Sequence, residues 1–258
     1  MKIAAVGLYT YIEFGACVAA FLPAMGIAHW LHRGDPGQRV PGQWMRRFGR
    51  VTSNLTPLWK FKVEGEAPRD ILSRAYVVVS NHESTADPFL LSHLPWDMRW
   101  IAKQEIFNLP VLGRMMKYSG DIPLRRGERD SVKQMMDEAK RTLEAGVPVM
   151  MFPEGTRSQN GELLPFKDGA FQLALDAGVP ILPLAVAGTR NCRPKGSKWF
   201  GDANAIVKVL EPIETAGLDV ATLRDRARNK IGAEVRLLRR RLGYEVSEIN
   251  TVTDEARA

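Results

Sequence analysis

The sequence predicts an α/β fold with a mainly parallel sheet, preceded by N-terminal helices that associate with a membrane. Three observations support this prediction. Short apolar runs alternate with helical periods from about residue 75 onward, as in layered folds built from βαβ units. Residues 3–31 are almost wholly apolar. Polar loops follow two of the apolar runs, at the ends of strands where α/β sheets hold their ligands.

The first apolar segment, residues 3–31, is long enough to cross a bilayer at about 1.5 Å of helix per residue. Its acidic residue, Glu13, and its continuation past residue 20 argue against a cleaved signal peptide. Glu13 and Pro23 leave two alternatives, a spanning helix and a shallow or re-entrant one. Five arginines between residues 33 and 50 would keep the rest of the chain in the cytoplasm.

Residues 43–61 are predicted to form an amphipathic helix. Its apolar face has aromatic residues at helical spacing, and its arginines fall largely off that face. Such a helix suits a membrane interface, the alternative being a helix packed on the protein core. We therefore predict N-terminal membrane-docking helices over 1–62 and a catalytic domain over 63–258. The apolar face comprises Trp44, Phe48, Val51, Leu55 and Trp59, and the arginines are Arg46, Arg47 and Arg50.

The rest of the chain supplies the strands and helices of the α/β domain. Residues 75–80 form a continuous β-branched run, which is typical of a buried strand. Prolines at 180 and 183 predict an edge strand or an irregular wall, either lining a lipid pocket or belonging to the core. Further strands are predicted at 98–102, 121–125, 147–152, 179–187 and 205–210, and helices at 89–94, 130–145, 168–177 and from Pro110.

Composition narrows the class of protein. Hydrophobic residues make up 45% of 258 residues and charged residues 25%, which excludes disorder and a polytopic membrane protein. Two cysteines exclude a disulfide framework and a four-cysteine zinc site. His29 and His32 are too few to indicate a metal site, and we expect none. The net charge is +7, and the excess of basic residues lies in residues 1–60 and 224–242, the rest of the chain being mildly acidic. This pattern favours anionic lipid or nucleic acid as a partner.

The first polar loop carries a histidine and an aspartate, His82 and Asp87. Five positions along an ideal helix turn about 500°, so these side chains meet only if the chain bends between them. Pro88 favours a bend, although Asp87 could merely cap the next helix. A His–Asp dyad activates a hydroxyl as a general base. Because no G-x-S-x-G nucleophile motif is present, we expect the substrate to supply that hydroxyl.

A second polar loop, Phe152–Ser158 (FPEGTRS), follows another predicted strand. Gly155 permits close approach of a ligand to the backbone. Arg157 and Thr156 suit a phosphate. A third stretch, Gly120–Gly127 (GDIPLRRG), ends in two adjacent arginines, which point to opposite faces of a strand.

These segments, in this order, resemble the four motif blocks of the glycerolipid acyltransferases, and within them the bacterial lysophosphatidate enzymes. The resemblance covers about residues 70–215 and implies a two-layer fold of that type. It also implies that His82 deprotonates the acceptor hydroxyl and that Asp87 orients its imidazole. The acceptor's phosphate region is then bound by Lys103, Arg126, Glu154, Gly155, Thr156 and Arg157. The matching blocks are Asn81–Pro88 (NHESTADP), Gly120–Arg126 (GDIPLRR), Phe152–Ser158 (FPEGTRS) and Val179–Pro183 (VPILP).

The activity implied is transfer of a fatty acyl group from acyl-CoA or acyl carrier protein to the sn-2 hydroxyl of 1-acyl-glycerol-3-phosphate, without a cofactor. The enzyme would act on the cytoplasmic side of a membrane, with lysophospholipid, thioester and membrane lipids as partners and no nucleic acid. Two departures concern specificity. Arg125 stands where the family often has an acid, and residues 83–86 lack a bulky aromatic. Another lyso-lipid acceptor, such as a lyso-ornithine lipid, is the alternative.

Overall fold

The structure, a computed structural model, describes residues 2–158, 161–193, 197 and 199–244. Within these residues seven strands form one sheet in the order β1-β7-β6-β2-β5-β3-β4. Every pair of neighbours is parallel except β6 and β7, which confirms the mainly parallel sheet. The strands are β1 (Trp59–Glu64), β2 (Val77–Ser80), β3 (Arg99–Lys103), β4 (Ile122–Leu124), β5 (Val149–Met151), β6 (Ile181–Ala187) and β7 (Ala203–Val209).

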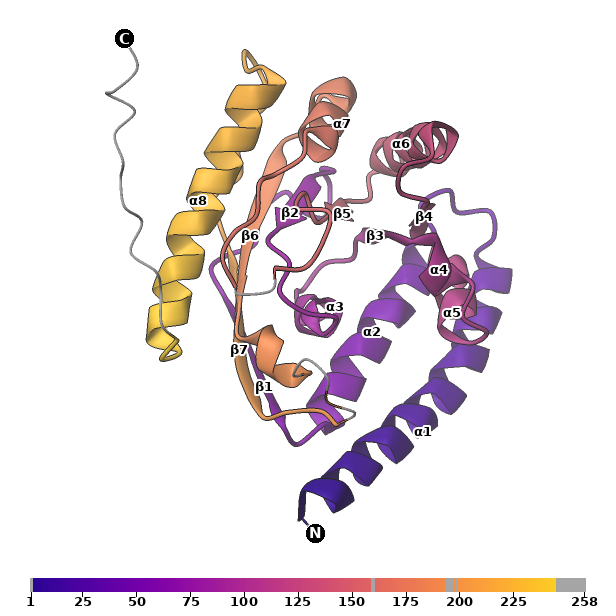
Figure 1. The fold of residues 1–258 in the computed structure, drawn as a ribbon. Coiled ribbons are helices and arrows are strands. Elements are labelled where there is room, and N and C mark those ends of the chain that lie inside the picture. Colours follow the sequence, from indigo (N-terminus) through magenta and orange to yellow (C-terminus); the bar gives the residue numbers. More distant parts are fainter. Residues whose placement is uncertain (1, 159–160, 194–196, 198, 245–258) are drawn as a thin grey trace.

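Helices lie on both sides of the sheet (Figure 1). Three longer helices, α6 (Arg129–Glu144), α7 (Gly169–Ala177) and α8 (Val220–Arg241), pack on one face. The other face is covered by α3 (Asp87–Leu91), behind which lie α2 (Arg39–Leu55) and α1 (Lys2–Leu31). Three short helices complete the fold: α4 (Gln104–Phe107), α5 (Leu112–Tyr118) and the 3-10 helix η1 (Thr189–Cys192).

The central strands are apolar without interruption because both of their faces are buried. In β2, Val77 and Val79 face the core formed with α6, α7 and α8, whereas Val78 faces the core formed with α3. β6 lies between β7 and β2, so the prediction of an edge strand there is wrong. Pro183 fits this position because the pairing with β7 covers only Leu184 to Ala187. The strand is buried along its whole length, as the core alternative predicts.

The first strand corrects the predicted helix over residues 43–61. The helix ends at Leu55, and Trp59 to Glu64 form β1, which pairs with β7. Pro57 explains the change, because a proline disfavours helical backbone at the residue before it, and Thr56 is extended. The predicted domain boundary after residue 62 therefore lies inside a strand.

The two N-terminal helices pack against each other. Phe14 and Phe21 of α1 contact Phe48 of α2, with ring centroids 5.8 and 5.7 Å apart, and Phe21 also contacts Trp44. α1 thus covers Trp44 and Phe48 of the apolar face of α2, as in the packed alternative, whereas Val51 and Leu55 stay 38% and 47% exposed. These contacts fix α1 along the side of the α/β body.

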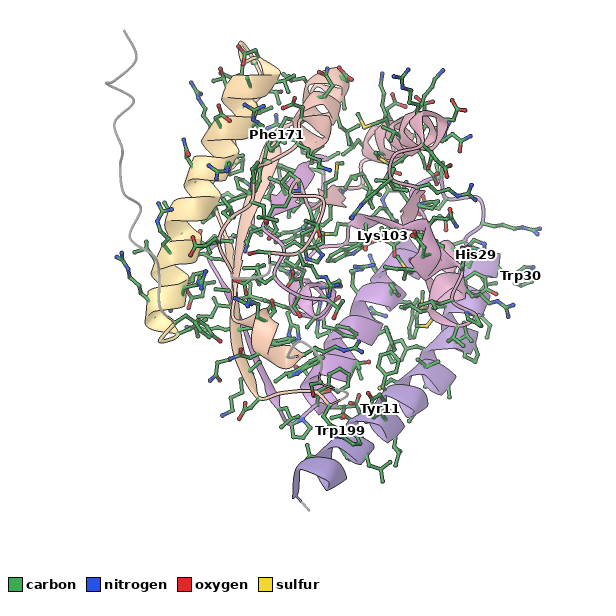
Figure 2. All side chains as sticks on the ribbon, viewed as in Figure 1. Tyr11, His29, Trp30, Lys103, Phe171 and Trp199 are labelled. Carbon is green, nitrogen blue, oxygen red and sulfur yellow. The ribbon has the colours of Figure 1, made fainter. Side chains whose placement is uncertain are left out.

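The exposed side of α1 is apolar. From Val6 to Leu31 the helix is long and apolar enough to cross a membrane, and Leu8, Ile12 and Trp30 are about 60% exposed. Near its N-terminal end Tyr11 contacts Trp199 at 6.0 Å, and Trp30 lies at the other end of the helix (Figure 2). Length and composition fit a membrane helix, and the choice between spanning and shallow insertion stays a prediction.

The two basic segments lie on opposite sides of the molecule. The basic helix α8 packs on the sheet face away from α1 (Figure 1). Two of its arginines pair with acidic residues of other elements: Arg224 with Asp168 before α7 at 2.7 Å, and Arg241 with Glu64 of β1 at 2.8 Å. Part of the basic charge of this helix is therefore balanced by acidic residues of the protein itself.

Candidate active site

The His–Asp pair predicted from the first polar loop is formed. His82 follows β2, and Asp87 begins α3 after a turn between them. His82 Nδ1 lies 2.6 Å from Asp87 Oδ2. The Asp87 side chain is fully buried, whereas that of His82 is 19% exposed. The bend at Ala86–Pro88 thus brings together two residues that a straight helix would separate.

Asp87 is held by donors other than the imidazole. The backbone N–H groups of Glu83 and Ser84 donate to its Oδ2 at 2.8 and 3.1 Å. The Thr189 hydroxyl, from η1 after β6, donates to Oδ1. With His82, these groups give the carboxylate four hydrogen bonds, which fix its position.

The ring of His82 is fixed on its other side by stacking. The Phe152 ring lies 4.0 Å from the imidazole centroid, at 18° to its plane. Because the Nδ1–H group donates a hydrogen bond to Asp87, Nε2 of the neutral imidazole is left as an acceptor. This arrangement can take a proton from a hydroxyl and stabilise the resulting imidazolium.

Glu154 joins the first polar loop to the second. Its Oε1 accepts from the backbone N–H of His82 at 2.7 Å, and its Oε2 from that of Leu164 at 3.0 Å. Burial raises the pKa of this carboxyl, and the two backbone donors oppose that shift. Glu154 is 4% exposed, so its contacts here hold the loop in place. Contact between Glu154 and a substrate stays a prediction.

The turn after β5 offers cations and a hydroxyl. Thr156 and Arg157 are exposed, and Gly155 has φ +69°, where a side chain would be strained. Lys167 crosses this turn, with Nζ 3.0 Å from where a Cβ on Gly155 would lie. The sequence interpretation missed Lys167, although it follows the same loop by ten residues.

The other two predicted phosphate ligands lie further along the same edge of the sheet. Lys103 ends β3, and Arg126 follows β4. Both are exposed, and Figure 2 locates Lys103 beside β3 and α4. β3 and β4 are second and third from β2 in the sheet, and the role of Lys103 and Arg126 as phosphate ligands stays a prediction. Arg125 pairs with Glu128 on the surface, at 3.6 Å.

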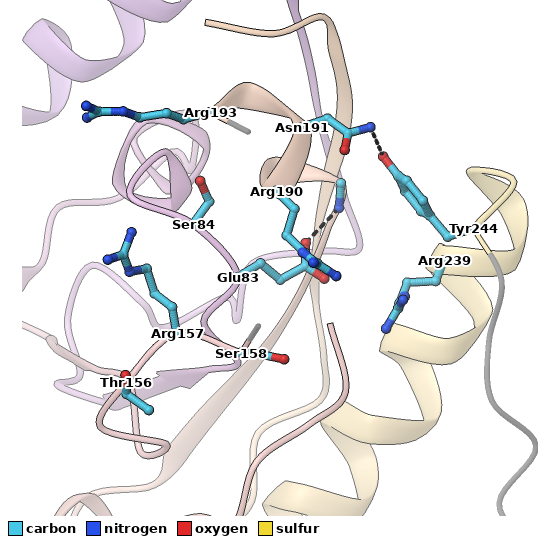
Figure 3. A pocket seen from close by; sticks show the side chains of 11 residues that line it. Glu83, Ser84, Thr156, Arg157, Ser158, Arg190, Asn191, Arg193, Arg239 and Tyr244 are labelled. Carbon is cyan, nitrogen blue, oxygen red and sulfur yellow. Dashed lines mark hydrogen bonds between the residues drawn. The ribbon is translucent and has the colours of Figure 1, made fainter. Parts of the chain in front are cut away.

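A cavity of about 620 Å³ opens beside the dyad loop, between the turn after β5 and the segment after β6 (Figure 3). It contains a buried carboxyl, Glu83, whose Oε2 accepts from Gly188 N–H at 3.0 Å. Burial, and secondarily the charge of Asp87, raises the pKa of Glu83 to about 8. Residues lining the cavity include Glu83, Arg157, Arg190, Arg193, Arg239 and Tyr244.

The sequence interpretation also missed the β6 side of the site. One signal was available: Gly188-Thr189-Arg190 follows an apolar run, as Gly155-Thr156-Arg157 does. Both glycines have positive φ, +97° and +69°. As to metals, the described residues hold no group of three or more His, Cys, Asp or Glu side chains that would bind an ion.

The sequence and the fold both match known proteins. The family model named Acyltransferase matches residues 60–187. A 1-acyl-sn-glycerol-3-phosphate acyltransferase of Haemophilus influenzae is 34% identical over 187 residues, covering 70% of this chain and 75% of that protein. The chloroplastic enzyme BAT2 of Brassica napus is 32% identical over 231 residues, or 86% of this chain.

The chain covers 66% of the BAT2 enzyme and 64% of a chloroplastic enzyme from Arabidopsis thaliana, just under two thirds of each. Among solved structures, the 1-acyl-sn-glycerophosphate acyltransferase PlsC of Thermotoga maritima aligns with a TM-score of 0.77 and 25% identity. That alignment covers 96% of this chain and 98% of the other.

Proposed function

This chain belongs to the acyltransferase family, and from that premise we propose that it converts 1-acyl-glycerol-3-phosphate into phosphatidate. The acyl group comes from a thioester, acyl-CoA or acyl carrier protein, and goes to the sn-2 hydroxyl. The observation that supports this most is the 2.6 Å contact between His82 and Asp87, beside a turn that carries Thr156 and Arg157.

In the proposed reaction His82 acts as a general base. Its Nε2 takes the proton of the acceptor hydroxyl as the hydroxyl oxygen attacks the thioester carbonyl carbon. When the tetrahedral intermediate collapses, the C–S bond breaks and the thiolate takes that proton from the imidazolium. The products are an ester and a free thiol. Asp87 stabilises the imidazolium, and no acyl-enzyme forms.

The acceptor's phosphate lies only two carbons from the reacting oxygen, so its ligands must lie close to His82. Thr156 and Arg157 meet this requirement, and Lys167 adds a cation over the same turn. A guanidinium binds phosphate through two parallel hydrogen bonds. Lys103 and Arg126 extend this positive edge along the sheet and draw the anionic headgroup toward the site.

We further propose that the enzyme works at the cytoplasmic membrane, with its catalytic body in the cytoplasm. The exposed apolar side of α1 supports membrane association. The arginines that follow α1 support this orientation. A lipid acceptor then reaches the site from the bilayer.

The decisive experiment compares wild-type protein with His82→Ala in acyl transfer from palmitoyl-CoA to lysophosphatidate. We expect the variant to lose about 10²–10⁴-fold in kcat, the usual contribution of a general base. The matched control is His32→Ala, which removes an exposed histidine and should keep full activity. Equal rates for His82→Ala and wild type would overturn the mechanism.

A panel of acceptors tests the substrate. Lysophosphatidate should be acylated at a higher kcat/KM than lyso-ornithine lipid, because Thr156, Arg157 and Lys167 suit a phosphate. The exposed Arg125 forms an ion pair with Glu128, so this arginine gives no reason to expect another headgroup. Preference for lyso-ornithine lipid would contradict the proposed acceptor and leave the acyl-transfer chemistry intact.

A further inference from the structure

We propose that the part of this cavity on the β6 side of the dyad binds the 4′-phosphate of the donor's phosphopantetheine arm, through Arg190 and Arg239. Acyl-CoA and acyl carrier protein share this phosphate. The inference rests on the proposed function and deepens it, because it divides the site between the two substrates. The acceptor then occupies the β5 side of His82 and the donor the β6 side.

The first support is the arrangement of two similar turns around one strand. β2, which ends at the dyad loop, lies between β5 and β6. A Gly-Thr-Arg turn follows each of these neighbours. The turn after β5 leads to Arg157 and the turn after β6 to Arg190. Two phosphate-bearing substrates that meet at one base can each use an anion site, and the sheet places an arginine in the turn on each side of β2.

The second support is the position of the arginines around the cavity. In Figure 3 Arg157 and Arg239 lie on opposite sides, and Arg190 lies between them above Glu83. Arg239 reaches the wall from α8, where it donates to the Gly161 carbonyl and pairs with Glu162 at 3.8 Å. These contacts orient a guanidinium that has five N–H donors.

The chemistry of the two substrates decides which phosphate goes where. In lysophosphatidate the phosphate is two carbons from the attacking oxygen, so it must lie next to His82. In the donor, the whole pantetheine arm separates the thioester carbonyl from the 4′-phosphate. The arginines on η1 and α8 stand across the cavity from the Thr156–Arg157 turn, where the far end of such an arm would reach.

Glu83 does not oppose an anion in this cavity near neutral pH. Its side chain is buried, and the raised pKa of about 8 keeps most of it protonated at pH 7. The groups that act on its charge are Asp87, which disfavours ionisation, and Arg190 and Arg239, which favour it. The cavity wall therefore remains positive.

The test measures kcat/KM with palmitoyl-CoA, palmitoyl-phosphopantetheine, palmitoyl-pantetheine and palmitoyl-acyl carrier protein. Wild type should use the three phosphate-bearing donors at least about tenfold better than palmitoyl-pantetheine, because a charge-assisted pair is lost with the phosphate. In Arg190→Gln this preference should fall toward one. An unchanged preference would overturn the inference. A loss confined to palmitoyl-CoA would also overturn it, because the arginines would then bind the nucleotide phosphates.

Two further variants separate donor from acceptor. Arg240→Gln removes an exposed arginine beside Arg239 that does not line the cavity, and it should leave the donor preference unchanged. Arg157→Gln should instead raise the KM for lysophosphatidate. If Arg190→Gln raised the acceptor's KM and left the donor's unchanged, the cavity would belong to the acceptor.

A binding measurement keeps this test independent of the proposed function. Titration calorimetry with free CoA, the product thiol, needs no acceptor. Wild type should bind CoA at least about tenfold more tightly than Arg190→Gln. Failure to acylate lysophosphatidate would contradict the proposed function alone, whereas equal CoA affinity in the two proteins would overturn the donor site.

Discussion

Charged side chains are buried in different ways at the carboxyl ends of the sheet's strands (the carboxyl edge) and at their amino ends (the opposite edge). At the carboxyl edge, beside the dyad, the buried charges are carboxyls, and most of their donors are backbone N–H groups of loops. At the opposite edge, the buried charges are arginines paired with aspartates. Loop backbone can hold a carboxylate and still leave a neighbouring imidazole nitrogen open to substrate. An arginine and an aspartate that pair with each other do not leave a side-chain nitrogen open to substrate in this way.

The opposite edge fastens α2 to the sheet. Arg46 of α2 is buried, lies 4.7 Å above the Trp100 ring, and pairs with Asp121 at 3.4 Å. Asp121 also accepts from Trp100 N–H and from the Ser119 hydroxyl, at 2.9 and 2.8 Å. This network corrects the expectation that Arg46 faces a membrane interface. The carboxyl edge thus supports chemistry, and the opposite edge supports the fold.

The largest effect on stability is expected from Arg46→Met, which tests the role of the opposite edge. The change removes one ion of a buried pair and leaves Asp121 without its cation, which costs about 3–5 kcal/mol in the free energy of unfolding. Guanidinium unfolding in detergent measures this loss. Both KM values should stay unchanged in the folded fraction, because Arg46 is remote from the dyad.

The matched control is the neighbouring Arg47→Met. Arg47 is exposed and stacks on Trp44 at 5.4 Å, so its loss should cost less than about 1 kcal/mol. Equal losses in stability for the two variants would contradict the view that the buried pair fastens α2.

A smaller effect is expected from Thr189→Val at the carboxyl edge. The variant keeps the shape of the side chain and removes a hydrogen bond to the charged Asp87, a contact worth about 1.5–3 kcal/mol. Because Thr189 acts through Asp87 as a positioning residue, kcat should fall about tenfold or more, with little change in either KM. Steady-state kinetics measures the split.

Thr189→Ser should restore most of kcat, since it returns the hydroxyl. Thr156→Val, in the equivalent turn after β5, should instead raise the KM for the acceptor. A rise in KM with Thr189→Val, or no rescue by serine, would contradict a positioning role. The two threonines therefore test whether similar turns serve different purposes.

The sequence predicted the parts of the site that are close together in the chain. His82 and Asp87 lie five residues apart, and Glu154 to Arg157 are consecutive, so local pattern and family resemblance sufficed. Thr189 reaches Asp87 from 102 residues away. No local pattern predicts such a contact, because it depends on β6 lying beside β2.

The same reason explains the errors in the fold. Most strands were predicted to within about two residues because burial on both faces makes them continuously apolar. β1 was assigned to a helix because its aromatic residues continue the spacing of α2, and only Pro57 marks the change. Arg46 was assigned to a surface because the helical periodicity of residues 43–61 does not reveal that Asp121, just before β4, pairs with it.

The last test concerns the pH dependence of stability at the carboxyl edge. The pKa of Glu83 is about 8 in the folded protein and near 4.5 when exposed. Between these values the folded state holds a proton that the unfolded state has released. Stability from this group is therefore complete below about pH 4.5 and is lost as pH rises through 8, by up to about 1.4 kcal/mol for each pH unit.

Glu83→Gln should remove this slope, because the amide cannot ionise and its oxygen still accepts from Gly188 N–H. Unfolding by guanidinium at pH 5.5, 6.5 and 7.5 should then show the variant gaining on wild type as pH rises. Glu66→Gln, on an exposed loop, should follow wild type. If Glu83→Gln also followed wild type, Glu83 would be ionised throughout this range, and the carboxyl edge would hold its charge by ion pairing, as the opposite edge does.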